Sequence, residues 1–216
     1  MAKKGFSDGE KAAYSLGFHV GSNVADHFTI DKDFANLAAD GFKEALLKEE
    51  PQIPGPEILA IVQELQMRKQ QEEADRMKNT AQENLDLGKK FTEALDKSFH
   101  CTASGICYKT EKEGDGKAHP KATDRVTVHY HLTLPVCAIK SLIGKVVDSS
   151  IARKEPATFG LNQVIPGWTE MVQLMTVGQK VTCYIPPNLG YGERGSGPDI
   201  QGNQLLCFTI ELLKIN

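Results

Sequence analysis

The side chains with the clearest chemical potential lie between Val147 and Tyr191. Asp148 follows a pair of valines, Trp168 is the only tryptophan of the chain, and Tyr191 lies between two glycines. An acid, an indole and a phenol in this setting predict an apolar hollow with few polar groups, which is the composition of a binding pocket. The sequence shows no nucleophile paired with a base, no phosphate-binding loop and no zinc-binding pattern. We therefore expect the hollow to act without a cofactor or a metal ion.

The elements that hold these side chains follow from the spacing of apolar residues. A Pro166-Gly167 pair predicts a turn, and a short helix is expected after it. The apolar face of this helix repeats at i, i+3, i+4 and i+7 and consists of Trp168, Met171, Val172 and Met175. Gly178 is expected at the end of the helix, and the alternation that follows predicts a half-buried strand over residues 181–185.

Strict alternation of apolar and other residues predicts two longer strands. Residues 126–134 place Tyr130 on the buried face of one strand, and residues 205–213 place Phe208 on the buried face of the other. Strands of this kind pack one face on a core. An antiparallel sheet curled over the Trp168 helix is therefore expected, which is an α+β arrangement.

The first half of the chain is predicted to form helices that need a partner. Ser7 and Glu10 fit a capping box, and apolar residues at helical spacing continue to Phe28 and resume from Phe34. Two helices of this length cannot bury so many apolar side chains by themselves. We therefore expect residues 1–65 to complete their core against a second copy of the chain, which would make the protein a homodimer.

A long polar helix is predicted between the two halves. Residues 49–56 contain three prolines and one glycine and are predicted to be a linker, whereas residues 57–99 contain no proline. A helix over the latter range would be about 65 Å long. Acidic residues lie four positions before basic ones along it, which favours an exposed helix. We predict a helical dimerisation region (1–55), a connecting helix (56–100) and a C-terminal domain (101–216).

The charge and composition argue against several classes of protein. A formal net charge of −3 gives no electrostatic reason to expect nucleic acid or an anionic membrane as partner. No apolar run approaches the roughly 18–20 residues of a membrane span. The five cysteines include no C-x-x-C pair, so we expect reduced thiols and a cytoplasmic location. A periplasmic or cell-surface location is the alternative if a signal peptide has been removed.

Several motifs occur in the order in which one family has them. They are V-T-V-H-Y (126–130), V-D-S-S (147–150), V-I-P-G-W (164–168), L-G-Y-G (189–192) and L-C-F-T-I-E-L-L (206–213). On these motifs the C-terminal half resembles the FK506-binding-protein (FKBP-type) peptidyl-prolyl cis/trans isomerases. The first half contains A-A-Y-S-L-G (12–17) and A-D-G-F-K-E-A-L (39–46) and is similar to the helical region of the two-domain bacterial Mip-like group. The resemblance implies an all-α dimerisation region, a stalk helix and an antiparallel β half-barrel wrapped on a short helix.

The resemblance also implies an activity, the cis/trans isomerisation of peptide bonds that precede proline, and a set of site residues. The catalytic residues that it implies are Asp148, Tyr191, Tyr130, Trp168 and Phe208. The substrate-binding residues that it implies are Val164, Ile165, Val147, Ile200 and Leu206. On this interpretation Trp168 is the floor under the proline ring, Ile165 offers its backbone N–H, and Tyr191 offers its hydroxyl. Val147 differs from the family pattern, which usually has phenylalanine before the aspartate.

Two functions of different classes remain open on the sequence. The first is a homodimeric isomerase that catalyses proline-limited folding and also acts as a chaperone. The second is a non-catalytic chaperone or peptide-binding scaffold that uses the same apolar pocket. The expected partners are unfolded or proline-containing polypeptides and macrolides of the FK506 and rapamycin type.

Overall fold

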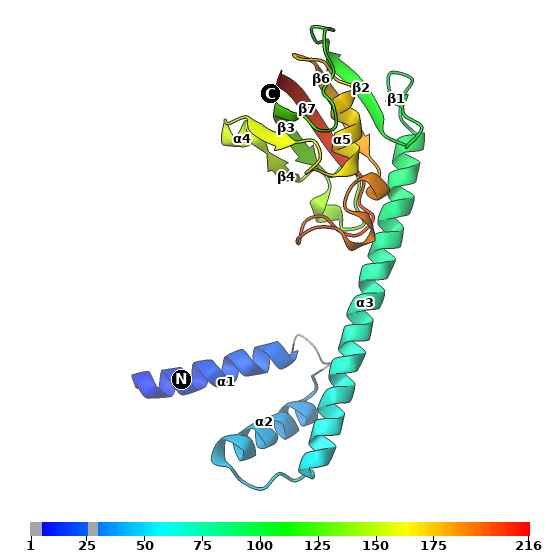
Figure 1. Ribbon diagram of the computed structural model, residues 1–216. Helices are drawn as coiled ribbons and strands as arrows, with labels where there is room; N and C mark the ends of the chain where they lie inside the picture. The colour runs from blue at the N-terminus through cyan, green and yellow to red at the C-terminus, as the bar shows by residue number, and fades with distance from the viewer. Residues whose placement is uncertain (1–5, 26–29) are drawn as a thin grey trace. The chain divides into compact units, whose positions relative to one another are not determined.

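A computed structural model describes residues 6–25 and 30–216, and Figure 1 shows the order of its elements. The chain divides into two compact units, Met1–Met67 and Arg68–Asn216. The described residues of the first unit form helices, and the second unit combines the end of a long helix with an antiparallel sheet. The α+β class expected from the sequence is therefore confirmed. The domain boundaries expected at residues 55 and 100 stay a prediction.

The described residues of the first unit form α1 (Asp8–Ala25), α2 (Lys32–Leu47) and the beginning of α3 (Gly55–Glu93). None of the described residues of α1 and α2 is buried. Their apolar side chains therefore remain accessible within a single chain, as the sequence pattern led us to expect. Phe28, which was expected to extend the first helix, lies outside the described residues.

Side-chain caps explain where α1 and α2 begin. The N–H of Ser7 donates to Glu10 Oε2 at 2.8 Å, and the N–H of Glu10 donates to Ser7 Oγ at 3.4 Å. This is the predicted capping box. The Asp31 carboxylate accepts a hydrogen bond from the N–H of Phe34 at 2.7 Å and begins α2 in the same manner.

Helix α3 is shorter than its sequence predicts. The prediction that it continues to Phe99 is wrong, because it ends at Glu93. The carboxylate of Asp96 accepts a hydrogen bond from the N–H of Ser98 at 2.7 Å, and this local turn replaces the hydrogen bonds of a further helical turn. Most of α3 is exposed, as its charge pattern predicts. Its buried residues form one stripe and are Ala81, Asn84 and Gly88.

The second unit is built on a seven-stranded antiparallel sheet with the order β1-β2-β6-β7-β3-β4, in which β5 also pairs with β3. The strands are β1 (His100–Cys101), β2 (Cys107–Lys112), β3 (Arg125–Thr133), β4 (Val146–Ser149), β5 (Ala157–Gly160), β6 (Lys180–Ile185) and β7 (Leu206–Ile215). The two central strands β3 and β7 align Tyr130 with Ile210 and Leu132 with Phe208. Both strands alternate between buried and half-buried residues along most of their length, as predicted.

The helix α5 (Pro166–Gln173) packs on this sheet, as Figure 1 shows. Trp168, Met171 and Val172 are buried in this helix, and Met175 is buried two residues after its end, which confirms the predicted apolar face. The helix ends at Gln173, so the prediction that Gly178 marks its end is wrong. Gly178 instead has a φ of 83° in the turn before β6. The remaining short helices are α4 (Ser150–Arg153), η1 (Lys140–Leu142), η2 (Pro187–Leu189) and η3 (Gly192–Arg194).

The cysteines differ from the expectation of reduced thiols. Cys101 and Cys107 form a disulfide, because they are opposite each other in the hairpin of β1 and β2. That pairing is set by strand register, which the spacing of the cysteines does not reveal. Cys137 and Cys183 are free and buried, and Cys207 is free and half-buried. Buried thiols of this kind serve as small apolar side chains.

No helix among the described residues is long and apolar enough to cross a membrane. Within the same described ranges, no three acidic, histidine or cysteine side chains come together as a set of metal ligands.

Candidate active site

A cavity of about 450 Å³ opens beside α5 in the second unit. Seven of the predicted site residues line it, and they are Tyr130, Asp148, Val164, Ile165, Trp168, Tyr191 and Phe208. They come from β3, β4, α5 and the two residues before it, the turn between η2 and η3, and β7. Segments that lie far apart in the sequence thus converge on the indole of Trp168.

Aromatic rings form the floor and the walls of the cavity. The ring centroid of Trp168 lies 5.4 Å from that of Tyr130, 5.6 Å from that of Phe159 and 5.4 Å from that of Phe208. The interplanar angles are 84°, 85° and 79°, so each ring meets the indole edge to face. This geometry is favourable for aromatic pairs and holds the indole in one orientation. The indole therefore presents a fixed apolar surface of a size suited to a small ring.

The polar corner of the cavity is a network of three side chains. The hydroxyl of Tyr130 donates to Asp148 Oδ2 at 2.5 Å. The guanidinium of Arg153 donates to the other oxygen of Asp148 and, at 2.8 Å, to the hydroxyl of Tyr130. The guanidinium carbon also lies 5.6 Å from the centroid of the Tyr130 ring, within the range of a cation–π contact. Arg153 thus holds both the acid and the phenol in place.

The network fixes the charge of Asp148. Burial by itself raises the pKa of this carboxyl, but the hydrogen bonds from Tyr130 and Arg153 outweigh burial and lower the pKa. Burial and the hydrogen bond to Asp148 raise the pKa of the Tyr130 hydroxyl. At neutral pH the corner therefore consists of a carboxylate, a guanidinium and a neutral phenol. A carboxylate with a lowered pKa is a poor proton donor, so the corner supplies a fixed charge pair rather than acid catalysis.

Two hydrogen-bond donors on the cavity wall are available to a ligand. The hydroxyl of Tyr191 makes no hydrogen bond with the part of the chain that the structure describes, and this side chain is 37% exposed. Burial and the charge of Asp148 raise the pKa of the Tyr191 hydroxyl, so it stays protonated at neutral pH. Among the same residues, the N–H of Ile165 likewise has no acceptor, while the Ile165 carbonyl accepts from the N–H of Trp168 at 2.9 Å. A few polar groups usually orient the ligand in an apolar pocket, and both donors are placed to do so.

Three of the predicted substrate-binding residues do not line the cavity. Val147 is half-buried and packs against the core, and Leu206 is fully buried at the beginning of β7. Ile200 is buried in the loop between η3 and β7, where its backbone pairs with Ser196. The assignment of all three to substrate binding stays a prediction that rests on the resemblance.

The structure adds four residues to the site that sequence reasoning missed. Leu132, Phe159 and Gln163 line the cavity, and Arg153 completes its polar corner. Leu132 could have been found, since it lies two residues after Tyr130 and therefore on the same face of β3. Arg153 could not, because its place depends on the single turn of α4.

Comparisons with known proteins show the family of the chain. The family model of the FKBP-type peptidyl-prolyl cis-trans isomerase matches residues 116–213, and the model of the domain amino terminal to it matches residues 9–110. The chain is 38% identical over 213 residues to the FKBP-type isomerase FkpA of Aeromonas hydrophila, covering 95% of this chain and 76% of the relative. It is 35% identical over 207 residues to the FKBP-type 22 kDa isomerase of Escherichia coli, and the match covers 95% of this chain and 94% of the relative.

A solved structure of a member of this family has a similar fold. The crystal structure of FkpA from Escherichia coli matches with a TM-score of 0.77 and 33% identity over 97% of both chains. The matches thus cover the N-terminal helical region as well as the C-terminal domain, which confirms the resemblance seen in the sequence motifs. This chain belongs to the FKBP-type peptidyl-prolyl cis-trans isomerase family.

Proposed function

We propose that the cavity around Trp168 is where this isomerase rotates the peptide bond before proline. The observation that carries the proposal is an apolar floor of fixed orientation with two available donors, the Ile165 N–H and the Tyr191 hydroxyl, on its wall. The proline ring would rest on the indole. The two donors would then hold the substrate carbonyls on either side of the bond that rotates.

The physical chemistry of the reaction suits such a site. Amide resonance gives the peptide bond a rotation barrier of about 18–20 kcal/mol. The planar amide is more polar than the twisted one, so an apolar cavity destabilises the planar ground state relative to the transition state. Proline is the natural substrate, because its two isomers are close in energy but exchange slowly. The Asp148–Arg153 pair would add a fixed field beside the twisting amide without exchanging a proton.

A refolding assay with a proline-limited slow phase tests this assignment. The wild-type chain should accelerate the slow phase, and a variant with both Asp148→Ala and Tyr191→Phe should lose most of the acceleration. Lys117→Ala serves as the control, since this exposed lysine lies outside the cavity. Equal acceleration by the wild type and the double variant would reject the proposed site.

We also propose that the same cavity binds macrolides of the FK506 type, as the family resemblance implies. An apolar macrolide would compete with the proline ring for the indole surface. Quenching of Trp168 fluorescence during a macrolide titration should therefore coincide with loss of isomerase activity. Quenching without inhibition would place the macrolide elsewhere.

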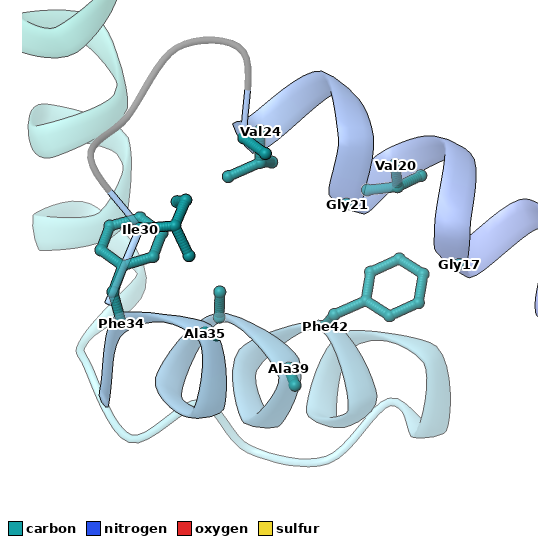
Figure 2. A pocket seen from close by; sticks show the side chains of 11 residues that line it. Gly17, Val20, Gly21, Val24, Ile30, Phe34, Ala35, Ala39 and Phe42 are labelled. Carbon is teal, nitrogen blue, oxygen red and sulfur yellow. The ribbon is translucent and has the colours of Figure 1, made fainter. Parts of the chain in front are cut away.

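We further propose that the first unit forms a homodimer and binds unfolded clients. Between α1 and α2 lies an apolar groove of about 620 Å³, and Figure 2 shows its side chains pointing toward one another across the gap. Prominent among them are Val20, Val24, Ile30, Phe34, Ala39 and Phe42. Tyr14, Phe18, Leu37 and Leu46 on the same helices are also exposed. An apolar surface of this extent on short helices favours a second copy as its cover.

Light scattering of the full chain distinguishes the dimer from a monomer. Val20→Asp puts a charge into the groove and should yield monomers, whereas Ser15→Asp on the same helix lies outside the groove and should leave the dimer intact. The monomeric variant should retain activity on short peptides, because the isomerase cavity lies wholly in the second unit. It should be weaker on unfolded proteins, since a dimer engages two segments of one client. A Val20→Asp variant that stays dimeric would contradict the proposal.

The cellular compartment is a separate proposal. The Cys101–Cys107 disulfide favours an oxidising compartment, such as the periplasm or the cell surface, over the cytoplasm that the cysteine count suggested. Alkylation of free thiols in intact cells tests this. Protection of both cysteines in the native host would support an oxidising compartment, and their full labelling would support the cytoplasm.

A further inference from the structure

One polar residue of α3 is buried at the junction with the isomerase domain. Asn84 is 1% exposed, and both polar atoms of its side-chain amide form a hydrogen bond. Its Nδ2 donates to the carbonyl of Gly202 at 3.0 Å, and its Oδ1 accepts from the N–H of Ala138 at 2.7 Å. The two partners lie in different loops, far from Asn84 in the sequence. A helix that needed only to dock on the domain could use apolar side chains, so a buried amide with two such partners points to a positioning role.

The bond to Gly202 leads toward the turn that carries Tyr191. The residue after Gly202, Asn203, donates its N–H to the carbonyl of Gly192 at 2.8 Å. A Cβ at Gly202 would lie 2.2 Å from the carbonyl oxygen of Glu193 and 2.9 Å from Cβ of Ala81. Gly202 is therefore pressed between α3 and the turn, and Figure 1 shows this loop lying against the helix. A shift of Gly202 would be passed directly to the residues beside Tyr191.

The bond to Ala138 ties a second loop, residues 134–145, to the same point of α3. This loop and the loop of Gly202 are also tied to each other. The side chain of Gln204 donates to the carbonyl of Val136, and Lys145 forms an ion pair with Asp199 at 2.7 Å. Asn84 is thus the residue at which the helix and both loops are joined by hydrogen bonds.

We propose that Asn84 is a positioning residue of the isomerase reaction, which holds the Tyr191 turn at its working distance from the cavity through Gly202. The inference rests on the proposed role of Tyr191 in the reaction. It makes α3 a part of the catalytic domain rather than a spacer. The substitution that separates the two hydrogen bonds is Asn84→Asp, which keeps the acceptor for Ala138 but loses the donor to Gly202.

A double-mutant cycle in the full-length protein tests the proposal, with kcat and kcat/KM measured on a short proline peptide. Asn84→Asp should lower both parameters about tenfold, because the interaction with the turn matters in the transition state. In a Tyr191→Phe background the same substitution should change them by less than about twofold. Because Asn84→Asp buries a carboxylate, the cycle is repeated with Asn84→Ala, and Trp168 fluorescence verifies that each variant is folded. Gln82→Ala, an exposed position one half-turn away, should leave both parameters unchanged.

Three results would overturn the proposal, and each would show which step of the argument fails. Equal losses in the wild-type and Tyr191→Phe backgrounds would mean that Asn84 acts on stability alone. Unchanged activity of the Asn84 variants would mean that the turn keeps its place without them. Full activity of Tyr191→Phe would remove the residue on which the inference rests while leaving the isomerase function intact. The failure of the proposed function itself is distinguishable from all three, because the wild type would then show no activity.

Discussion

Gly167 offers a sharp test of how closely α5 must approach the sheet. It is the second residue of the helix and precedes Trp168. A Cβ there would lie 2.4 Å from Cγ2 of Ile185 and 3.1 Å from the carbonyl oxygen of Leu189. Ordinary van der Waals contact begins at 3.4 Å. Gly167→Ala therefore requires the start of the helix, or Ile185, to move by about 1 Å.

Two opposing effects decide the outcome. Alanine favours a helix over glycine by about 1 kcal/mol at most. Overpacking a dense core costs about 1–3 kcal/mol. Ile185 is fully buried and the Leu189 atom belongs to the backbone, so neither can move away easily. We therefore expect Gly167→Ala to lower the free energy of unfolding by about 1–2 kcal/mol. Because the neighbouring indole must shift as well, activity should fall by about 10- to 100-fold.

Urea unfolding followed by Trp168 fluorescence, together with kcat/KM on a short proline peptide, measures both effects. The matched control is Gly9→Ala, since Gly9 is also the second residue of its helix but a Cβ there would have no neighbour within 4 Å. It should leave activity and the Trp168 transition unchanged. Gly167→Ala should cost less in an Ile185→Ala background, where the clashing methyl groups are gone. A Gly167→Ala variant as stable and active as the wild type would refute the reasoning.

Three further predictions concern the polar corner and the disulfide. Arg153→Met should raise the pKa of Asp148 and reduce kcat/KM about tenfold, while urea unfolding changes by less than about 1 kcal/mol, because the ion pair is half exposed. Retained activity would contradict this. The pKa of Asp148 is lowered in the folded state, so the effect of its charge on activity is present at neutral pH and is lost only as the pH falls through this pKa, which lies below the ordinary range of an aspartate. Asp148→Asn should abolish this acid limb of the kcat/KM profile, and a wild-type limb above about pH 5 would show that another group is responsible. Replacing Cys101 and Cys107 together by serine should destabilise the second unit by about 2–3 kcal/mol in urea unfolding. A reductant should have the same effect on the wild type and none on the double variant, and insensitivity of the wild type would contradict the disulfide's role.

The centre of the site could be predicted from the sequence because it depends on local periodicity. Alternation along β3 and β7 places Tyr130 and Phe208 on the buried face, and helical spacing places Trp168 beneath them. Once β3 and β7 are paired, their register alone determines which of these side chains are neighbours. The motif order supplied the rest, including Asp148 and the turn of Tyr191.

Other features depend on contacts that no local pattern encodes. Arg153 is the last residue of α4, a single turn that is followed by Lys154 with a left-handed backbone, and its contact with Asp148 depends on this turn. Asn84 lies in a polar helix that looks solvated throughout, yet its partners are loops far along the chain. The disulfide of Cys101 depends on strand register in the same way. Long-range packing, rather than residue type, determines each of these.

The strands at the edges of the sheet are short. β1 has two residues, and β4 and β5 have four each. The pairing of β4 with β3 also shifts register between Leu132 and Thr133. Short, irregular edges give an unfolded chain little main chain to align with, so a client cannot readily add a strand to the sheet. If the chain binds unfolded clients as proposed, contacts with side chains rather than strand pairing must hold them, and the short edges also keep the sheet from joining aggregated chains.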